Sequence, residues 1–266
     1  MLKADLQDVA AGEFEKLVTT QATASDEMRA SNRVPAVLSV NLNDRAFLME
    51  AVKGEELYHL VEEAEDHLAL LQRAGAWIDA FHRAGLEEQR IFRPGFNSKR
   101  LKDLREQVKS GRLKATDEED YLRALDQVLD VLPDFAGKPT QVAWQHGDLN
   151  LHNLLMAGDE MWGIDFTKVD PVPIGYDVAR FLLHYSALLA DHGRLEPGWP
   201  APPAAVEAFF KGYQLATFDD PSIQAILRVK ILNDWTRYPV SHLKMKTRQR
   251  FRFERYRDIL RSLMAA

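Results

Sequence analysis

The spacing of apolar residues changes near Lys53-Gly54, and this change predicts two parts of the chain. Before it, residues 34–40 and 45–51 read as strands joined by the turn signal Asn-Leu-Asn-Asp, which predicts a β-hairpin. After it, apolar residues recur every three or four positions, which is the period of helices with one buried face. We therefore expect a partial N-terminal lobe and hinge in residues 1–53 and a mainly helical lobe in residues 54–266.

The remaining elements follow from the same two periods. Leu2 to Ala4 reads as the tail of a strand, and Asp8 to about Thr20 as a helix. A short strand is expected at 142–144, and a second hairpin with strands at 154–156 and 161–164 lies between helices. Further helices are predicted at 57–84, 101–110, 118–132, 176–190, 204–213, 223–235 and 247–264. We read the fold class as α+β.

Composition narrows the class of protein without naming its chemistry. The 266 residues are 46% hydrophobic and 28% charged, as in ordinary soluble globular proteins. A net charge of -6 disfavours a nucleic-acid partner, and the absence of cysteine excludes disulfides, thiolate nucleophiles and Cys-ligated zinc. The start shows no signal-peptide pattern, and the longest apolar stretch, 179–190, is too short to span a bilayer. We expect a cytoplasmic protein with no membrane partner; its oligomeric state is open.

A group of polar residues leads into the second hairpin. His146-Gly147-Asp148 is followed, after four residues, by Asn153, and Asp165 comes twelve residues later. Asn153 directly precedes the first strand of the hairpin, and Asp165 directly follows the second. Because an antiparallel hairpin brings these flanks together at its open end, we expect Asn153 and Asp165 side by side, with the Asp148 loop leading to the same place.

These side chains suit a magnesium-dependent phosphoryl transfer. An amide oxygen and a carboxylate are hard oxygen ligands, and Mg²⁺ takes few protein ligands while water and phosphate oxygens fill its other positions. A separate carboxylate can orient an acceptor hydroxyl and receive its proton. The alternative is structural: His146 and Asp148 could cap a turn, and Asp165 could hydrogen-bond the backbone at the hairpin end.

On these motifs the sequence resembles the aminoglycoside phosphotransferase and choline kinase superfamily, whose fold is related to protein kinases. The similarity runs over nearly the whole chain and is sharpest around the His-Gly-Asp motif. The resemblance implies that Asp148 is the catalytic base and that Asn153 and Asp165 are the metal ligands. Gly147, where many protein kinases have Arg, and Thr167, where they have the glycine of Asp-Phe-Gly, indicate the small-molecule branch of this fold.

The same resemblance assigns the nucleotide end and implies ATP and Mg²⁺ as cofactors. Glu50 and Val52 lie in a segment that looks like the family's hinge between lobes, where backbone N–H and C=O groups hydrogen-bond the adenine edge. Lys3 resembles the lysine that contacts the phosphates. Glu13, or Glu15, on the following helix resembles the ion-pair partner of that lysine.

A phosphate-covering glycine loop does not precede Lys3 in this sequence. Gly12 is the only glycine before Gly54. Two explanations are open: the sequence starts at an internal methionine of a longer reading frame, or the protein is a natural variant without the loop. Loss of the loop would leave the phosphates wetter and less well positioned, so the activity of this chain is open as well.

Three further polar residues have mainly structural interpretations. Asp177 resembles the acidic residue at the family's Asp-Leu-Ala helix start, and we read it as a brace for the catalytic loop. His82 echoes a common helix ending of the family and is expected to be structural. His152 is expected to be a loop or packing residue.

The acceptor is expected to bind against the C-terminal helices, as the resemblance implies. Polar and aromatic candidates there are Asp170, Trp199, Asp234, Trp235 and Arg237, with Trp235 expected in the core. The tail carries eight basic residues from Lys244 to Arg261, most of them in the predicted last helix. It is either amphipathic with a solvated basic face or a site for an anionic acceptor, and it argues against a polycationic drug as the acceptor.

The sequence thus predicts a two-lobed, protein-kinase-like α+β fold with a reduced N-terminal β lobe. The predicted reaction moves the γ-phosphoryl group of ATP to a hydroxyl of a sugar, amino alcohol or related metabolite. A second hypothesis is a pseudokinase-like module that binds nucleotide with little or no turnover. A third is a metal-dependent hydrolase that would use His146, Asp148, His152 and Asp165.

Overall fold

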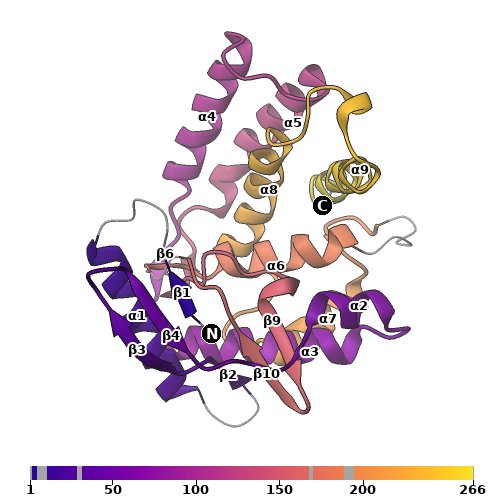
Figure 1. The fold of residues 1–266 in the computed structure, drawn as a ribbon. Helices are drawn as coiled ribbons and strands as arrows, with labels where there is room; N and C mark the ends of the chain where they lie inside the picture. Colours follow the sequence, from indigo (N-terminus) through magenta and orange to yellow (C-terminus); the bar gives the residue numbers. More distant parts are fainter. Residues whose placement is uncertain (1, 5–10, 29–31, 168–169, 189–194, 266) are drawn as a thin grey trace.

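The protein combines small β-sheets with a larger set of helices (Figure 1). The computed structural model describes residues 2–4, 11–28, 32–167, 170–188 and 195–265. Strands gather at one end of the molecule, and the helices α4, α5, α8 and α9 lie at the other, with α6 between them (Figure 1). The predicted α+β class is confirmed.

A three-stranded antiparallel sheet with strand order β1-β4-β3 forms the N-terminal region. Helix α1 packs against it, and Phe14 and Val18 of this helix meet Phe47 and Met49 of the sheet in a small core of their own. Since this core is separate from the main one, the sheet and its helix form a distinct packing unit. The elements are β1 (Leu2–Ala4), α1 (Ala11–Glu27), β3 (Val37–Asn41) and β4 (Ala46–Met49).

The second sheet contains the hairpin that follows the polar motif, and its order is β2-β10-β9-β5. Strands β9 and β10 pair antiparallel, with Gly163 opposite Leu154 at the open end. A Cβ atom on Gly163 would lie 1.9 Å from Trp77 Cζ2, so only glycine lets the hairpin approach this buried indole. The strands are β2 (Asn32–Arg33), β5 (Glu55–Glu56), β9 (Leu154–Ala157) and β10 (Glu160–Gly163).

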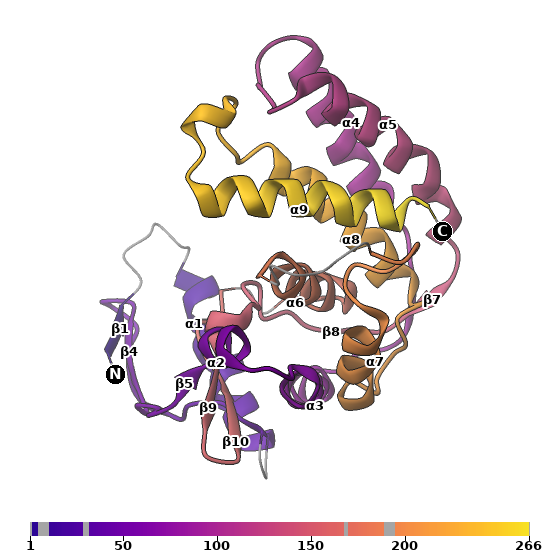
Figure 2. The same ribbon diagram turned by 90° about the vertical axis from the view of Figure 1, so that its right-hand side faces the viewer.

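The helices enclose the main core. Helix α3 packs on α7, and α6 packs on α8 and α9 (Figure 2). The helices are α2 (Leu57–Glu63), α3 (Leu68–Ala84), α4 (Gly95–Lys109), α5 (Glu118–Val131), α6 (Gly175–Leu188), α7 (Pro203–Gly212), α8 (Pro221–Trp235) and α9 (Thr247–Leu263). Two small sheets pair β6 (Arg90–Ile91) with β7 (Pro139–Thr140) and β8 (Val142–Trp144) with β11 (Pro171–Pro173).

Both predicted hairpins are confirmed, and the prediction of one helix over 57–84 is wrong. The helix is interrupted after Glu63, where Ala64 has an extended backbone (ψ 137°). The side chain of Asp66 then accepts a hydrogen bond from the N–H of Leu68 at 2.9 Å and so helps to start α3. A local side-chain contact therefore outweighed a continuous apolar period.

Other differences concern element ends. Helix α1 extends to Glu27, beyond the expected end near Thr20, and α4 begins at Gly95, before the expected start at 101. Residues 5–10 include the predicted start of the first helix, and residues 189–194 include the predicted end of the helix at 176–190. Both ranges lie outside the described residues. The strands of two or three residues, β2, β5, β6, β7 and β11, were not predicted because they are too short to show a period.

A search for membrane spans covered the part of the chain that the structure describes. No helix in it has both the length and the apolar character needed to cross a bilayer. The cytoplasmic location stays a prediction.

Candidate active site

The polar motif forms a loop between β8 and β9, and its own side chains shape it. Asn150 donates through Nδ2 to the carbonyl of Asp148 at 2.8 Å and accepts from the N–H of His152 at 2.9 Å. Gly147 has φ 83°, in the left-handed region where other residues are strained. The loop conformation therefore depends on a glycine and on short-range amide contacts.

A buried carboxylate anchors the start of this loop. Asp177, in the first turn of α6, accepts hydrogen bonds from the backbone N–H groups of His146 at 2.7 Å and Gly147 at 3.3 Å. His82 donates to the same carboxylate at 3.4 Å through Nε2, and its Nδ1 lies 2.9 Å from the hydroxyl of Tyr213. The predictions that Asp177 braces the loop and that His82 is structural are confirmed.

The electrostatics of this network keep Asp177 ionised. Burial alone would raise the pKa of its carboxyl group, but the hydrogen bond and charge of His82, with those of His146, lower it overall. The neighbouring hydroxyl of Tyr213 has its pKa raised, first by burial and then by nearby carboxylates. Buried hydrogen-bonding groups thus connect the loop to α3, to α6 and to the chain after α7.

His146 lies inside the core rather than in an open site. Its ring stacks on Phe166 with ring centroids 4.5 Å apart, and burial lowers its pKa. Its Nδ1 accepts from the N–H of Asp148 at 3.4 Å. The His-Gly-Asp and Asp-Phe segments are therefore joined by an aromatic stack between the imidazole of His146 and Phe166.

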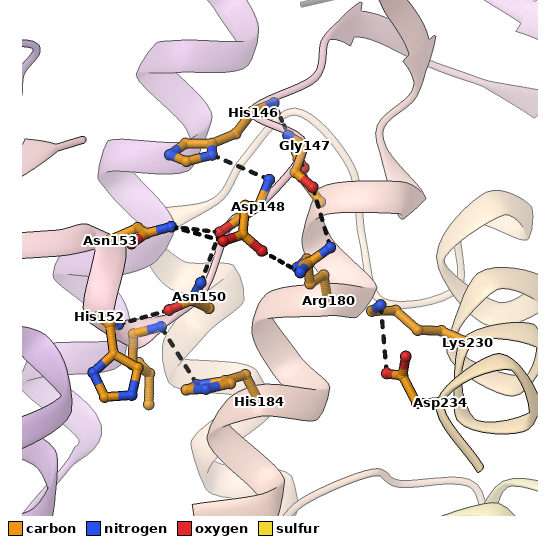
Figure 3. Close-up of polar contacts among 12 residues, drawn as sticks. His146, Gly147, Asp148, Asn150, His152, Asn153, Arg180, His184, Lys230 and Asp234 are labelled. Atoms are coloured by element: carbon orange, nitrogen blue, oxygen red, sulfur yellow. Dashed lines mark hydrogen bonds and ion pairs between the residues drawn. The ribbon is translucent and has the colours of Figure 1, made fainter. Parts of the chain in front are cut away.

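Asp148 lies between an amide and a guanidinium group (Figure 3). Asn153 donates to its carbonyl at 2.8 Å and to its Oδ2 at 3.3 Å, and Arg180 pairs with its Oδ1. Arg180 also donates to the carbonyl of Gly147 at 3.1 Å. Since the Asp148 side chain remains 38% exposed, it is held in one orientation while it stays accessible from solvent.

Asn153 and Asp165 flank the open end of the β9–β10 hairpin, as their sequence positions predicted. The N–H of Ile164 donates to the carbonyl of Asn153 at 3.0 Å, so the backbones on either side are neighbours. The amide nitrogen of Asn153 is used by Asp148, which leaves its carbonyl oxygen as the group for another partner. Asp165 has φ 62°, a left-handed conformation that is uncommon outside glycine and recurs at functional sites.

No cluster of three His, Asp or Glu side chains suited to a metal occurs among the described residues. His152 is exposed, its ring stacks on Tyr58, and its Nδ1 lies 2.7 Å from Glu56 Oε2. His146 is buried in the core. Neither histidine is arranged as the hydrolase hypothesis requires, whereas a site of one amide and one carboxylate is compatible with Mg²⁺.

The residues expected at the nucleotide end occupy three different settings. Glu50 is exposed and its N–H donates to the carbonyl of Ala36 at 2.9 Å, while Val52 lies in a connection outside every helix and strand. Lys3 pairs with Phe47 in the sheet, but its side chain lies outside what the structure describes. Glu13 is exposed on α1, so its pairing with Lys3 stays a prediction.

A pocket of about 490 Å³ opens beside the Asp148 loop. The Asp148 loop, α6, α8, α9 and the segment after α8 contribute to it. Its lining residues are Asn150, His152, Arg180, His184, Lys230, Asp234, Arg237, Tyr238, Arg248, Gln249, Arg252 and Tyr256. Because Arg180 both lines this pocket and pairs with Asp148, the pocket lies beside the carboxylate, with Arg180 as the link between them.

Two of the five acceptor-side candidates line this pocket, and three do not. Asp234 and Arg237 are in its lining. Trp235 is buried and donates to the carbonyl of Thr116 at 2.7 Å, which confirms its expected place in the core. Trp199 stacks on Phe218 with centroids 5.0 Å apart, and Asp170 pairs with Lys16 of α1.

Arg180 and His184 were not predicted as site residues, although their spacing holds the signal. They follow Asp177 by three and seven positions, so all three lie on one face of α6. Arg248, Arg252 and Tyr256 are likewise four residues apart on α9 and line the pocket together. The period alone could not reveal which partner each face meets.

Comparisons with known proteins agree with this geometry. A family model described as a phosphotransferase enzyme family matches residues 11–226. A search of curated protein sequences gave no match.

Similar folds occur among solved structures. A choline/ethanolamine kinase family protein from Mesorhizobium loti has a TM-score of 0.62 at 14% identity, over 100% of this chain and 86% of that one. Amicoumacin kinase hAmiN with AMP-PNP, Ca²⁺ and Ami has a TM-score of 0.57 at 13% identity, over 97% and 80%. An aminoglycoside phosphotransferase from Streptomyces rimosus with ADP and streptomycin has a TM-score of 0.52 at 20% identity, over 87% and 85%.

Proposed function

The chain belongs to the phosphotransferase enzyme family, and from this premise we propose that it transfers the γ-phosphoryl group of ATP to a hydroxyl group of a small molecule. The observation that carries the proposal is the setting of Asp148. This carboxylate is fixed by Asn153 and Arg180, remains accessible, and adjoins a pocket large enough for a metabolite.

Asp148 acts as the base in the proposed reaction. Its carboxylate accepts the proton of the acceptor hydroxyl while the hydroxyl oxygen bonds to the γ-phosphorus and the bond to the β-phosphate oxygen breaks. ADP leaves with that oxygen, and the product is a phosphate monoester. Arg180 limits the rotation of the carboxylate, and positioning of this kind supplies much of the rate in phosphoryl transfer.

Asn153 and Asp165 are the proposed holders of Mg²⁺. The carbonyl oxygen of Asn153 is available because its amide nitrogen is committed to Asp148, and Asp165 follows the same hairpin. Magnesium bound there would neutralise charge on the phosphates of ATP. Amicoumacin kinase, which shares the fold, was solved with a nucleotide analogue and a divalent cation, and this supports a site of the same kind.

Backbone groups near Glu50 and Val52 are proposed to hydrogen-bond the adenine, with Lys3 near the phosphates and Glu13 as its partner. The segment 51–54 belongs to no helix or strand, so its backbone groups are free of a sheet ladder. Gly54 packs so closely on β9 that a Cβ atom would lie 2.7 Å from the carbonyl oxygen of Met156. The hinge is thereby fixed against the hairpin that carries the proposed metal ligands.

The test of this function is turnover by the purified protein with Mg·ATP and a library of hydroxylated metabolites, read by mass spectrometry for phosphorylated products. We expect Asp148→Asn to lower kcat by roughly two to four powers of ten, because a positioned base is lost. ATP affinity should change little. Asp159→Asn, at the exposed tip of the hairpin, is the matched control and should retain activity.

Unchanged turnover of the Asp148→Asn variant would refute the assignment. Mg·ATP binding without any phosphorylated product across the library would instead favour a nucleotide-binding module with little or no turnover.

The proposed metal site has a separate test. Asp165→Ala should abolish Mg²⁺-dependent binding of ATP, because the site keeps one protein ligand of two. Titration calorimetry with and without Mg²⁺ measures this. Intact Mg·ATP binding in the variant would show that Asp165 is not a ligand.

A further inference from the structure

The pocket beside Asp148 has an excess of positive charge. Five of its lining side chains are cations and one is a carboxylate. The cations come from three helices and from the segment that follows α8. They are Arg180, Lys230, Arg237, Arg248 and Arg252, and the carboxylate is Asp234.

The carboxylates near the pocket do not balance these cations. Asp234 is shared, since its Oδ2 lies 3.5 Å from Lys230 and its Oδ1 lies 3.2 Å from Arg237. Arg248 reaches Glu62 only at 4.0 Å, between two exposed side chains, a contact of little energetic value. Arg252 has no ion pair with any carboxylate that the structure describes.

The pKa of a half-buried imidazole in the lining reflects this charge. Burial first, and then the charges of Arg252, His152, Arg180 and Lys230, together lower the pKa of His184 to about 3. Burial also lowers the pKa of Lys230, to which Arg180 and Arg237 add. A positive potential in the pocket disfavours further protonation, so lowered pKa values of its basic groups are expected.

The pocket charges range from highly exposed to largely buried side chains. The side chains of Arg248 and Arg237 are 88% and 70% exposed, whereas Lys230 is 19% exposed and Tyr256 is buried. Rim cations attract an anion from solution, and a partly buried cation holds it in a medium of lower polarity. In Figure 3, Lys230 lies on the far side of Arg180 from Asn153; Arg180 lines the pocket together with Lys230 and pairs with Asp148.

We propose that the acceptor is a small hydroxylated metabolite that carries an anionic group, a carboxylate or a phosphate, an inference that rests on the proposed function. The anionic group pairs with Lys230 and Arg252 while the hydroxyl reaches Asp148. A polycation such as an aminoglycoside would place its ammonium groups against these side chains, and like charges at this distance oppose binding.

A set of probes on one sugar scaffold tests the proposal. Glucose, glucosamine, glucuronate and glucose 6-phosphate differ mainly in charge, and calorimetry measures their binding to the full chain with Mg·AMP-PNP present. We expect the better anionic probe to bind at least about tenfold more tightly than glucose, and glucosamine to bind more weakly than glucose. The anion advantage should shrink as NaCl is raised from low to high concentration. Whether glucuronate or glucose 6-phosphate binds more tightly distinguishes a carboxylate site from a phosphate site.

Arg252→Gln is the informative variant, because it removes a pocket charge that pairs with no described carboxylate. It should weaken anion binding roughly fivefold or more and leave glucose binding unchanged. Arg250→Gln on the same helix is the matched control, since Arg250 is exposed and its Nη2 donates to the carbonyl of His242 at 2.8 Å, away from the pocket lining. Its binding profile should match the wild type.

Failure of this inference is separable from failure of the proposed function. Equal or tighter binding of glucose or glucosamine, absence of binding by both anions, or an Arg252→Gln variant that keeps the anion preference overturns the acceptor class. Absence of Mg·ATP binding in the same samples refutes the kinase proposal itself.

Discussion

The two sides of the Asp148 loop differ in how completely their charged side chains are paired. On the inner side, Asp177 is surrounded by the donors His82, His146 and Gly147 and is closed off from solvent. On the outer side, Asp148 is partly exposed and pairs with Arg180, which lines a pocket whose cations outnumber its carboxylates. On the inner side the Asp177 carboxylate is paired with donors, whereas on the outer side several cations lack a carboxylate of their own. This contrast indicates that the inner side sets stability and the outer side is available for binding.

The largest effect is expected from breaking the inner side. Asp177→Ala leaves two loop N–H groups and a buried imidazole without their acceptor, and the free energy of unfolding should fall by about 3 kcal/mol or more. Urea denaturation followed by circular dichroism measures the loss. Asp159→Ala, at the exposed hairpin tip, is the control and should change stability by less than about 0.5 kcal/mol. A loss below about 1 kcal/mol for Asp177→Ala would mean that the brace is dispensable.

A smaller effect is expected from acid, because the buried His146 and the half-buried His184 both resist protonation. The pKa of His146 is lowered and that of His184 falls to about 3, so below pH 6.5 the unfolded chain binds protons that the folded chain does not. The contribution of these histidines to the free energy of unfolding therefore has its full value above pH 6.5 and declines as the pH falls toward 3. Each histidine contributes up to about 1.4 kcal/mol per pH unit in this window.

The His184→Gln variant sharpens that prediction. It should lose about 2 kcal/mol less than the wild type between pH 7 and pH 5. Urea denaturation at several pH values gives the two curves. Parallel curves would show that His184 takes up protons freely in the folded protein.

The smallest effect on stability is expected from the outer side. Arg237→Gln removes a cation that is 70% exposed and shares Asp234 with Lys230, so stability should change by less than about 0.5 kcal/mol. A loss above about 1 kcal/mol would break the proposed contrast, because it would give a pocket charge a structural role.

Local patterns in the sequence predicted the parts of the site that depend on neighbouring residues. The spacing from Asp148 to Asn153, with Asp165 after the second strand, located the open end of the hairpin before any coordinates were considered. Helix ends were less predictable, and side-chain contacts of Asp66 and His67 accompany the break between α2 and α3. Periodicity predicts which face of an element is buried, but not where a competing hydrogen bond interrupts it.

The pocket was only partly predictable. The sequence shows many basic residues in the last helix, and their amphipathic arrangement is confirmed by the burial of Phe253, Tyr256 and Ile259. It does not show that Arg252 meets Arg180 and Lys230, which come from two other helices. Charges more than twenty residues apart in sequence converge only when helix packing sets the distances between them.

The sequence by itself determined the α+β class, the two hairpins and the polar motif, because turns, apolar periods and short spacings act between residues close in the chain. The tertiary structure alone decided that His82 and Asp177 meet behind the loop and that cations from α6, α8 and α9 surround one pocket. The physical reason is that burial and long-range electrostatics depend on which surfaces pack together, and that choice is made by the whole core rather than by any local segment.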